Sequence, residues 1–229
     1  MDDHAPDLGF HVKVEPFRYG DVALRVASLR DNLEFHDPDG EAERLGISSA
    51  QWPIAGLIWP SGHVLAELMS AFPLAGRRVL EVGCGIGLAS LVCQARGAAV
   101  TATDIHPLVG PLLARNAAAN GLAPIPYHRG DWGHDHPELG RFDLLIGSDL
   151  LYEQTHPALL ADFMARHAAP SAEVVLVDPG RGERGAFARA MAAHGFTGDA
   201  LRAPLTLPGG EPFRGTILTL RRAAAPPEP

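Results

Sequence analysis

The sequence has only two cysteines among its 229 residues, Cys84 and Cys93. Two thiols are too few for a disulfide framework or a four-cysteine zinc site. No stretch approaches the roughly 20 consecutive apolar residues that a membrane-spanning helix needs, and the acidic first eight residues lack the apolar core of a secretion signal. These absences predict a cytoplasmic protein that does not associate with membranes.

Positive charge is also scarce. Lysine and arginine number 19 against 27 aspartates and glutamates, which gives a net charge of -8, and Lys13 is the single lysine. Proteins that bind duplex nucleic acid usually carry a basic face, and no basic run is visible here, so we expect no nucleic-acid partner. The 46% of hydrophobic residues is typical of a folded protein, and the length fits one domain with at most a small appendage.

Strand-like and helix-like segments alternate along most of the chain. Apolar, β-branched patterns predict strands at residues 78–82, 99–103, 125–128, 142–147, 174–177, 201–207 and 216–220. Helical spacing predicts helices at residues 61–72, with Ser61 as the N-cap, and at 88–96, 107–121, 157–167 and 185–194. This alternation predicts an α/β fold with a parallel sheet covered on both faces. The short turn between the last two strands predicts an antiparallel pair at one end.

The N-terminal part has a different pattern. Residues 10–26 alternate apolar and polar side chains around Tyr19-Gly20-Asp21, which predicts a β-hairpin. The polar residues 37–53 predict a cover loop, and the first eight residues look like a frayed end. We therefore divide the chain into an N-terminal extension (1–55), a main α/β domain (56–222) and a disordered tail (223–229).

A glycine-rich turn follows the first strand of the main domain, with the sequence Glu81-Val82-Gly83-Cys84-Gly85-Ile86-Gly87. Glycines let the backbone approach a ligand closely, and the helix that follows offers unpaired N–H groups. Asp104, at the end of the second strand, can accept hydrogen bonds from a ribose diol. Because Leu88 stands where a dinucleotide loop has its last glycine, the turn favours an adenosine with an uncharged or cationic tail over a pyrophosphate.

A second polar segment follows the fourth strand, Ser148-Asp149-Leu150-Leu151-Tyr152-Glu153. In a doubly wound sheet this strand end borders the ligand crevice. The Asp149 carboxylate and the Tyr152 phenol can together orient an amine by accepting hydrogen bonds. The residues alone leave a structural alternative open, in which Asp149 caps the next turn and Tyr152 lies in the core.

The glycine turn resembles motif I of the class I, seven-β-strand methyltransferases that use S-adenosyl-L-methionine. The resemblance extends over about residues 56–222 and implies a doubly wound, Rossmann-like, seven-stranded sheet with an antiparallel last strand. It places the glycine turn around the methionine part of the cofactor, Asp104 at the ribose, and the residues after the second and third strands at the adenine. The cofactor-binding residues it implies are Trp59, Glu81, Gly83, Cys84, Gly85, Gly87, Asp104, Ile105, Asp131, Trp132 and Ser148.

Three further motifs are specific for one branch of these methyltransferases, although not for its substrate. Asp149-Leu150-Leu151-Tyr152 is similar to the [DE]xx[YF] element of non-histone protein-lysine methyltransferases. Ile58-Trp59-Pro60-Ser61-Gly62 and Asp178-Pro179-Gly180-Arg181 are similar to the branch that includes the electron-transfer-flavoprotein β-subunit lysine methyltransferase and nicotinamide N-methyltransferase-like proteins. The resemblance implies that Asp149 and Tyr152 are catalytic and that the acceptor is a lysine of a protein.

Other functions remain open at this point. The main alternative is a small-molecule, nicotinamide-like N-methyltransferase. A nucleotide-dependent oxidoreductase or a non-catalytic nucleoside-binding module is a third interpretation. Three of the cofactor residues also have structural alternatives. Asp131 could be a helix cap in a polar loop, Trp59 a helix-entry staple or a core residue, and Trp132 an ordinary partly buried aromatic.

Several residues are predicted to have no chemical role. His134-Asp135-His136 are adjacent and lack a spaced further ligand, so we predict no metal site. Cys84 is interpreted as a small loop residue rather than a nucleophile, because no base is paired with it. Asn116 is predicted to lie on a helix surface and Asn120 to end that helix.

Overall fold

The computed structural model describes residues 2–5, 10–33, 37, 39–203 and 205–223. Its main domain is a seven-stranded sheet with the order β6-β5-β4-β7-β8-β10-β9. The strands are β4 (Arg78–Val82), β5 (Ala99–Asp104), β6 (Tyr127–Arg129), β7 (Phe142–Ser148), β8 (Ala168–Asp178), β9 (Thr197–Arg202) and β10 (Thr216–Arg222). Neighbours among β4 to β8 pair in parallel, whereas β10 runs antiparallel to both β8 and β9. The predicted Rossmann-like sheet with an antiparallel last strand is confirmed.

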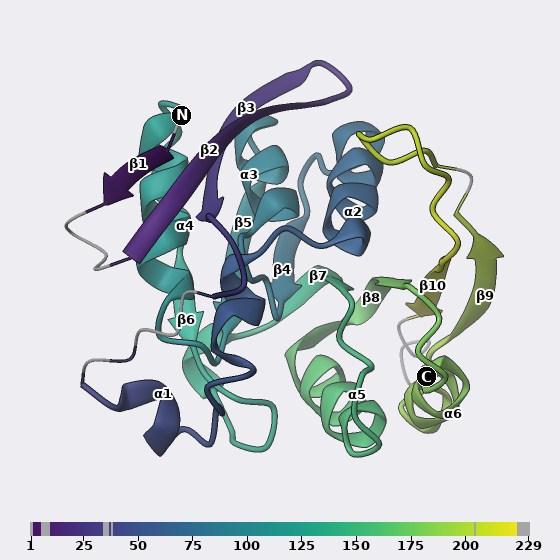
Figure 1. Cartoon of the computed structure of the whole chain (residues 1–229). Coiled ribbons are helices and arrows are strands. Elements are labelled where there is room, and N and C mark those ends of the chain that lie inside the picture. The colour runs from purple at the N-terminus through teal and green to yellow at the C-terminus, as the bar shows by residue number, and fades with distance from the viewer. Residues whose placement is uncertain (1, 6–9, 34–36, 38, 204, 224–229) are drawn as a thin grey trace, which may run out of the picture.

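Helices cover both faces of this sheet, as Figure 1 shows. Successive strand residues point to opposite faces, so Val79 joins a core with the three helices of one layer, and Leu80 joins a core with the two helices of the other. The first layer holds α2 (Pro60–Ala71), α3 (Leu88–Ala95) and α4 (Val109–Ala119), and the second holds α5 (His156–His167) and α6 (Arg184–Ala193). The result is a three-layer sandwich in which the carboxyl ends of the parallel strands lie along one edge of the sheet.

The N-terminal extension forms its own small sheet. The predicted hairpin is confirmed as β2 (Phe10–Tyr19) and β3 (Val22–Leu29). The expectation of a frayed N-terminus is wrong for four residues, because β1 (Asp2–Ala5) pairs antiparallel with β2. The predicted cover loop contains two short helices, α1 (Glu41–Arg44) and the 3₁₀ helix η1 (Trp52–Gly56). Asp37 accepts hydrogen bonds from the first backbone N–H groups of α1, which explains why a helix forms in this polar segment.

Two asparagines join the N-terminal sheet to the main domain. The Asn116 side chain, fully buried on α4, accepts from the Ala27 N–H (2.7 Å) and donates to the Ala27 carbonyl (3.0 Å). Asn120 makes the same pair of bonds to Arg25, at 2.7 and 2.8 Å. The two side chains thereby satisfy the outer edge of β3, which an edge strand otherwise leaves unpaired. The prediction that Asn116 is a helix-surface residue is wrong, because the β3 edge covers it.

Asn116→Ala is expected to lower the free energy of unfolding by about 2–4 kcal/mol, because both backbone groups of Ala27 would be left buried without partners. Asn120→Ala is the matched control. Its bonds lie at an exposed position, where water replaces them, so we expect a loss below about 1 kcal/mol. Urea unfolding of the two variants measures the difference, and equal losses would contradict the docking role of Asn116.

Several predicted boundaries shift. Helix α2 begins at Pro60 with Trp59 as its N-cap, so Ser61 is not the cap. Strand β6 is shorter and later than expected, and β9 ends at Arg202, where the prediction continued to residue 207. All but one residue of the predicted disordered tail, 223–229, lies outside the described residues. In the described part of the chain, no helix is long and apolar enough to span a bilayer.

Candidate active site

The glycine turn between β4 and α3 requires its glycines. Gly83, Gly85 and Gly87 all have positive φ, at 58°, 50° and 72°, a region that other L-residues rarely adopt. A Cβ at residue 83 would lie 2.5 Å from Leu150 Cδ2, and one at residue 85 would lie 3.2 Å from the Ala55 carbonyl oxygen. The turn therefore packs between the segment after β7 and the 3₁₀ helix η1. Cys84, within the turn, is buried, and burial raises the pKa of its thiol well above the usual value.

Asp104 bridges the glycine turn and the segment after β5. Its Oδ2 accepts from the Gly85 N–H and its Oδ1 from the His106 N–H, both at 2.9 Å. A carboxylate offers about four acceptor positions, so Asp104 can still accept from a ligand beside these backbone donors. Desolvation by burial raises the pKa of Asp104, against the hydrogen bonds that favour its charged form. Ile105, the next residue, is half-buried and follows the strand as predicted.

Glu81, near the end of β4, has its own partner in α3, and its predicted role beside the cofactor stays a prediction. Its side chain is buried, and its Oε2 accepts from both the N–H (2.7 Å) and the hydroxyl of Ser90 in the first turn of α3. The carboxyl group thus caps the helix that follows the glycine turn. Desolvation raises the pKa of Glu81 to about 7, with the Ser90 hydrogen bonds acting in the opposite direction.

The Glu81 pKa predicts a pH-dependent stability. The folded protein holds this proton more tightly than the unfolded chain, whose carboxyl titrates near 4.5. Ionisation of Glu81 therefore destabilises the folded state as the pH rises from about 4.5 to about 7, by roughly 3 kcal/mol in total. Urea unfolding across pH 5–8 should show this decline in the wild type and not in Glu81→Gln. Parallel curves for the two proteins would contradict the raised pKa.

Asp149 lies at the end of β7 in a strained backbone conformation. Its φ of 57° is the only positive value among the described non-glycine residues, and such strain often marks functional sites. Its carboxylate accepts two hydrogen bonds from Arg181, which follows β8: Nε to Oδ1 at 2.6 Å and Nη2 to Oδ2 at 3.0 Å. The Asp149 side chain is 11% exposed, whereas that of Arg181 is 45% exposed. The two-point pairing also raises the pKa of Arg181.

Tyr152 and Trp132 both pack against His156. The Tyr152 ring is 4.5 Å from the His156 ring and the Trp132 ring is 5.1 Å from it, both edge-on. Tyr152 is 49% exposed, which excludes the alternative that it is a core residue. Desolvation raises its pKa, and the nearby charges of Asp104, Glu153 and Asp149 raise it further. The carboxylate beside the glycine turn (Asp104) and the carboxylates after β7 (Asp149 and Glu153) therefore all raise the pKa of the Tyr152 phenol.

The remaining predicted residues surround this region. Trp59 is half-buried at the start of α2 and donates from Nε1 to the Ile54 carbonyl at 2.8 Å. A Cβ at Gly62, in the first turn of α2, would be 4.0 Å from Ser148 Oγ, so this helix end lies beside the end of β7. Asp131, after β6, accepts from the Gly133 and His134 N–H groups, which lie in a turn and not at the start of a helix. These bonds leave its role toward adenine a prediction.

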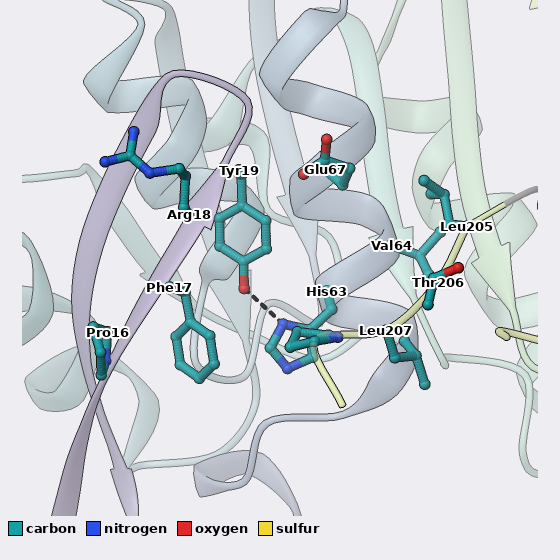
Figure 2. A pocket seen from close by; sticks show the side chains of 11 residues that line it. Pro16, Phe17, Arg18, Tyr19, His63, Val64, Glu67, Leu205, Thr206 and Leu207 are labelled. Carbon is teal, nitrogen blue, oxygen red and sulfur yellow. Dashed lines mark hydrogen bonds between the residues drawn. The ribbon is translucent and has the colours of Figure 1, made fainter. Parts of the chain in front are cut away.

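A recess of about 340 Å³ lies outside this set of residues. Figure 2 shows it between β2, α2 and residues 205–208. Inside it the Tyr19 hydroxyl is 2.7 Å from His63 Nδ1, with Glu67 one turn further along α2. Burial raises the pKa of Tyr19 and lowers that of His63. Because none of the predicted site residues lines the recess, it is separate from the candidate site.

Sequence reasoning missed two contacts of the site. It named Arg181 only as part of the motif Asp178-Pro179-Gly180-Arg181 and not as the partner of Asp149, 32 residues away. It did not consider His156, which connects the segments after β6 and β7. Strands β7 and β8 are neighbours in the sheet, which brings Asp149 and Arg181 together. The expected pairing of these two strands was the signal that could have suggested the contact.

Comparison with known families gives a match over most of the chain. A family model described as lysine methyltransferase matches residues 43–186. This range begins in α1 and ends in α6, so it includes the glycine turn, Asp104, Asp149 and Arg181.

Individual relatives and structures agree with this match. The electron transfer flavoprotein beta subunit lysine methyltransferase of Xenopus laevis is 31% identical over 136 residues, covering 57% of this chain and 54% of that protein. Protein N-lysine methyltransferase METTL21A of Danio rerio is 33% identical over 133 residues, covering 54% and 60%. The match thus spans little more than half the length of these curated relatives. Magnesium protoporphyrin IX methyltransferase of Synechocystis PCC 6803, solved with bound SAM, shares the fold with a TM-score of 0.54 at 20% identity, covering 70% of this chain and 76% of that one.

Proposed function

The chain belongs to the lysine methyltransferase family, and from this premise we propose that it transfers a methyl group from S-adenosyl-L-methionine to a lysine side chain of a protein. The observation that carries the proposal is the contact between the two halves of the site. Leu150, which follows Asp149, packs directly against Gly83 of the glycine turn. A cofactor in the turn and an amine at Asp149 would therefore meet at one edge of the sheet.

The residues around the glycine turn fit this cofactor. The three left-handed glycines put no side chains of their own between the turn and the amino-acid tail of a ligand, and the Asp104 carboxylate bonded to Gly85 can still accept from the ribose hydroxyls. When bound, S-adenosylmethionine supplies an electrophilic methyl group on a positively charged sulfur. The glycine turn and Asp104 would hold it, with S-adenosylhomocysteine as the product. Trp59, Ile105, Asp131 and Trp132 remain predicted contacts.

The charges around Tyr152 favour a cationic acceptor. Three carboxylates, those of Asp104, Glu153 and Asp149, raise the pKa of this phenol, and Arg181 alone lowers it. An incoming lysine ammonium would meet a net negative environment. Asp149 and Tyr152 would orient it by accepting its hydrogen bonds. Capture and orientation of the reacting amine can contribute several kcal/mol to lowering the barrier.

Arg181 reduces the tendency of Asp149 to keep the acceptor amine protonated. Only a neutral amine has a lone pair for the reaction, and a lysine amine has a pKa of about 10.4. A free carboxylate beside it would stabilise the ammonium and oppose loss of the proton. Because Arg181 compensates the charge of Asp149 with two hydrogen bonds, Asp149 can orient the nitrogen while stabilising its charge less. The proton is then released to water at this exposed position.

The exposure of the site favours a protein acceptor over a small molecule. Tyr152 and Arg181 are about half exposed, at 49% and 45%. The N-terminal hairpin, which would favour a small molecule if it formed a lid, is instead attached to α4 through Asn116 and Asn120. In the main domain the hairpin packs mainly against α4 and α2, and the exposed Tyr152 and Arg181 leave room for a peptide segment beside Asp149.

Radiolabelled methyl transfer tests the proposal. The protein is incubated with methyl-labelled cofactor and a cell extract, and the extract is separated into protein and small-molecule fractions. We expect label in the protein fraction, released by hydrolysis as methyl-lysine. Label confined to small molecules would favour the nicotinamide-like alternative, and no label in either would contradict both. Lys13→Arg removes the only lysine of the enzyme and excludes self-labelling. The expected absence of nucleic-acid and membrane partners and the cytoplasmic location stay predictions.

A further inference from the structure

Three side chains with metal-binding atoms converge beside β6. His128 is in that strand, His136 is in the loop that follows, and Glu138 is in the 3₁₀ helix η2 (Pro137–Leu139). His128 Nε2 lies 3.1 Å from His136 Nδ1 and 2.9 Å from Glu138 Oε1, and the last two atoms are 3.6 Å apart. Gly130 makes the return of the loop possible, since a Cβ there would lie 2.5 Å from the His136 ring.

The triangle has the size of one face of a zinc tetrahedron. Zinc bonds to histidine nitrogen and carboxylate oxygen are about 2.0–2.2 Å long, which places tetrahedral ligand atoms about 3.3–3.6 Å apart. The three measured separations, from 2.9 to 3.6 Å, lie at or slightly below this range. A shift of a few tenths of an ångström would admit the ion, with water in the fourth position.

A hydrogen bond outside the triangle orients one of the ligands. His136 Nε2 lies 2.9 Å from the Asp131 carbonyl oxygen, and because a carbonyl only accepts, Nε2 carries the proton. In the neutral ring the lone pair is then on Nδ1, which faces His128 and Glu138. Metal-bound histidines nearly always donate their other ring N–H in this way. The His136 ring also packs edge-on against Phe163, which restricts its rotation.

We propose that His128, His136 and Glu138 form a binding site for a zinc-like divalent transition-metal ion. Two imidazoles and one carboxylate suit zinc, whereas magnesium prefers oxygen ligands alone. In the absence of metal, His128 Nε2 donates to its two neighbours, so binding requires that this nitrogen release its proton to solvent or to Nδ1. The site differs from His134-Asp135-His136, for which adjacency in the sequence predicted no metal. His134 bonds instead to Asp131.

Calorimetric titration of the full chain with Zn²⁺ tests the site directly, without cofactor or acceptor. We expect saturable binding of one ion per chain and no comparable binding of Mg²⁺. Glu138→Gln and His128→Ala should each weaken zinc binding by at least ~10-fold. Replacing a residue that only hydrogen-bonds to a metal ligand already weakens metal binding about 10- to 100-fold, and these two residues would be ligands themselves. Glu138 is 55% exposed, so its replacement leaves the fold intact.

His194→Ala is the matched control. His194 Nε2 lies 2.8 Å from Asp162 Oδ1 at a similar exposure, and the described residues offer this pair no third ligand. The control should bind zinc as the wild type does. Absence of saturable zinc binding, or equal affinities of the wild type and Glu138→Gln, would overturn the proposal. Because no methyl transfer is measured, either result is independent of the proposed enzymatic function.

Discussion

Asp149→Asn is expected to reduce methyl transfer at least ~100-fold while leaving the affinity for S-adenosylhomocysteine unchanged. Asparagine tolerates the positive φ of this position, so the backbone should be retained. The amide has no charge, however, and its NH₂ group cannot accept from Arg181 or from an amine. Arg181 would keep one acceptor, Oδ1, but its charge would no longer be compensated and would repel the incoming ammonium, and misplaced reacting groups commonly cause losses of this size.

Two measurements separate the two roles. Radiolabelled transfer to the protein fraction of an extract reports the reaction, and calorimetry with S-adenosylhomocysteine reports cofactor binding. Asp143→Asn is the matched control, because Asp143 lies at the opposite end of β7 and accepts a backbone N–H from Arg78. It should transfer at the wild-type rate. Full transfer by Asp149→Asn would remove this residue from the mechanism.

Gly85→Arg is expected to weaken cofactor binding at least ~100-fold, equivalent to about 2.8 kcal/mol. The backbone at residue 85 has a φ of 50° and a Cβ there would come within 3.2 Å of the Ala55 carbonyl. Because this contact is with backbone and the φ is left-handed, the turn must shift to accept the side chain, and its amides then leave the positions in which they would hold the ligand. Calorimetric titration with S-adenosylhomocysteine measures the loss.

Gly97→Arg provides the control for backbone strain. Gly97 follows α3 with a φ of 74°, and a Cβ at this residue would have no atom within 4 Å. The two variants therefore introduce the same side chain into the same backbone region, one against the predicted site and one in open space. Retained binding in Gly97→Arg and lost binding in Gly85→Arg would assign the effect to the site. Equal binding by both would contradict the role of the glycine turn.

The fold was largely predictable because its elements carry local signals. β-Branched strands, amphipathic helices and glycine stops indicated the order of the main domain and the antiparallel last strand. Strand β1 was missed because four residues form it only by pairing with β2. Asn116 was assigned to a surface because a polar side chain on a helix has the same pattern whether water or a strand edge covers it. Only the position of β3 distinguishes the two cases.

The candidate site was predictable in its parts and less so in its pairings. The glycines and Asp104 are at fixed distances from strand ends, and those ends meet at one edge of a parallel sheet. Arg181 and Asp149 come from different strand ends, and nothing in either segment indicates that they bind each other. The cluster of His128, His136 and Glu138 likewise depends on a loop that returns to its own strand. Contacts of this kind are set by tertiary structure.

A crystal structure of the protein with S-adenosylhomocysteine tests the central claim most directly. We expect the amino-acid tail of this nucleoside against Gly83, Gly85 and Gly87, with both ribose hydroxyls bonded to the carboxylate of Asp104. Its sulfur should point toward Asp149. Density for the nucleoside at another place on the molecule, or for a different coenzyme in this crevice, would contradict the account.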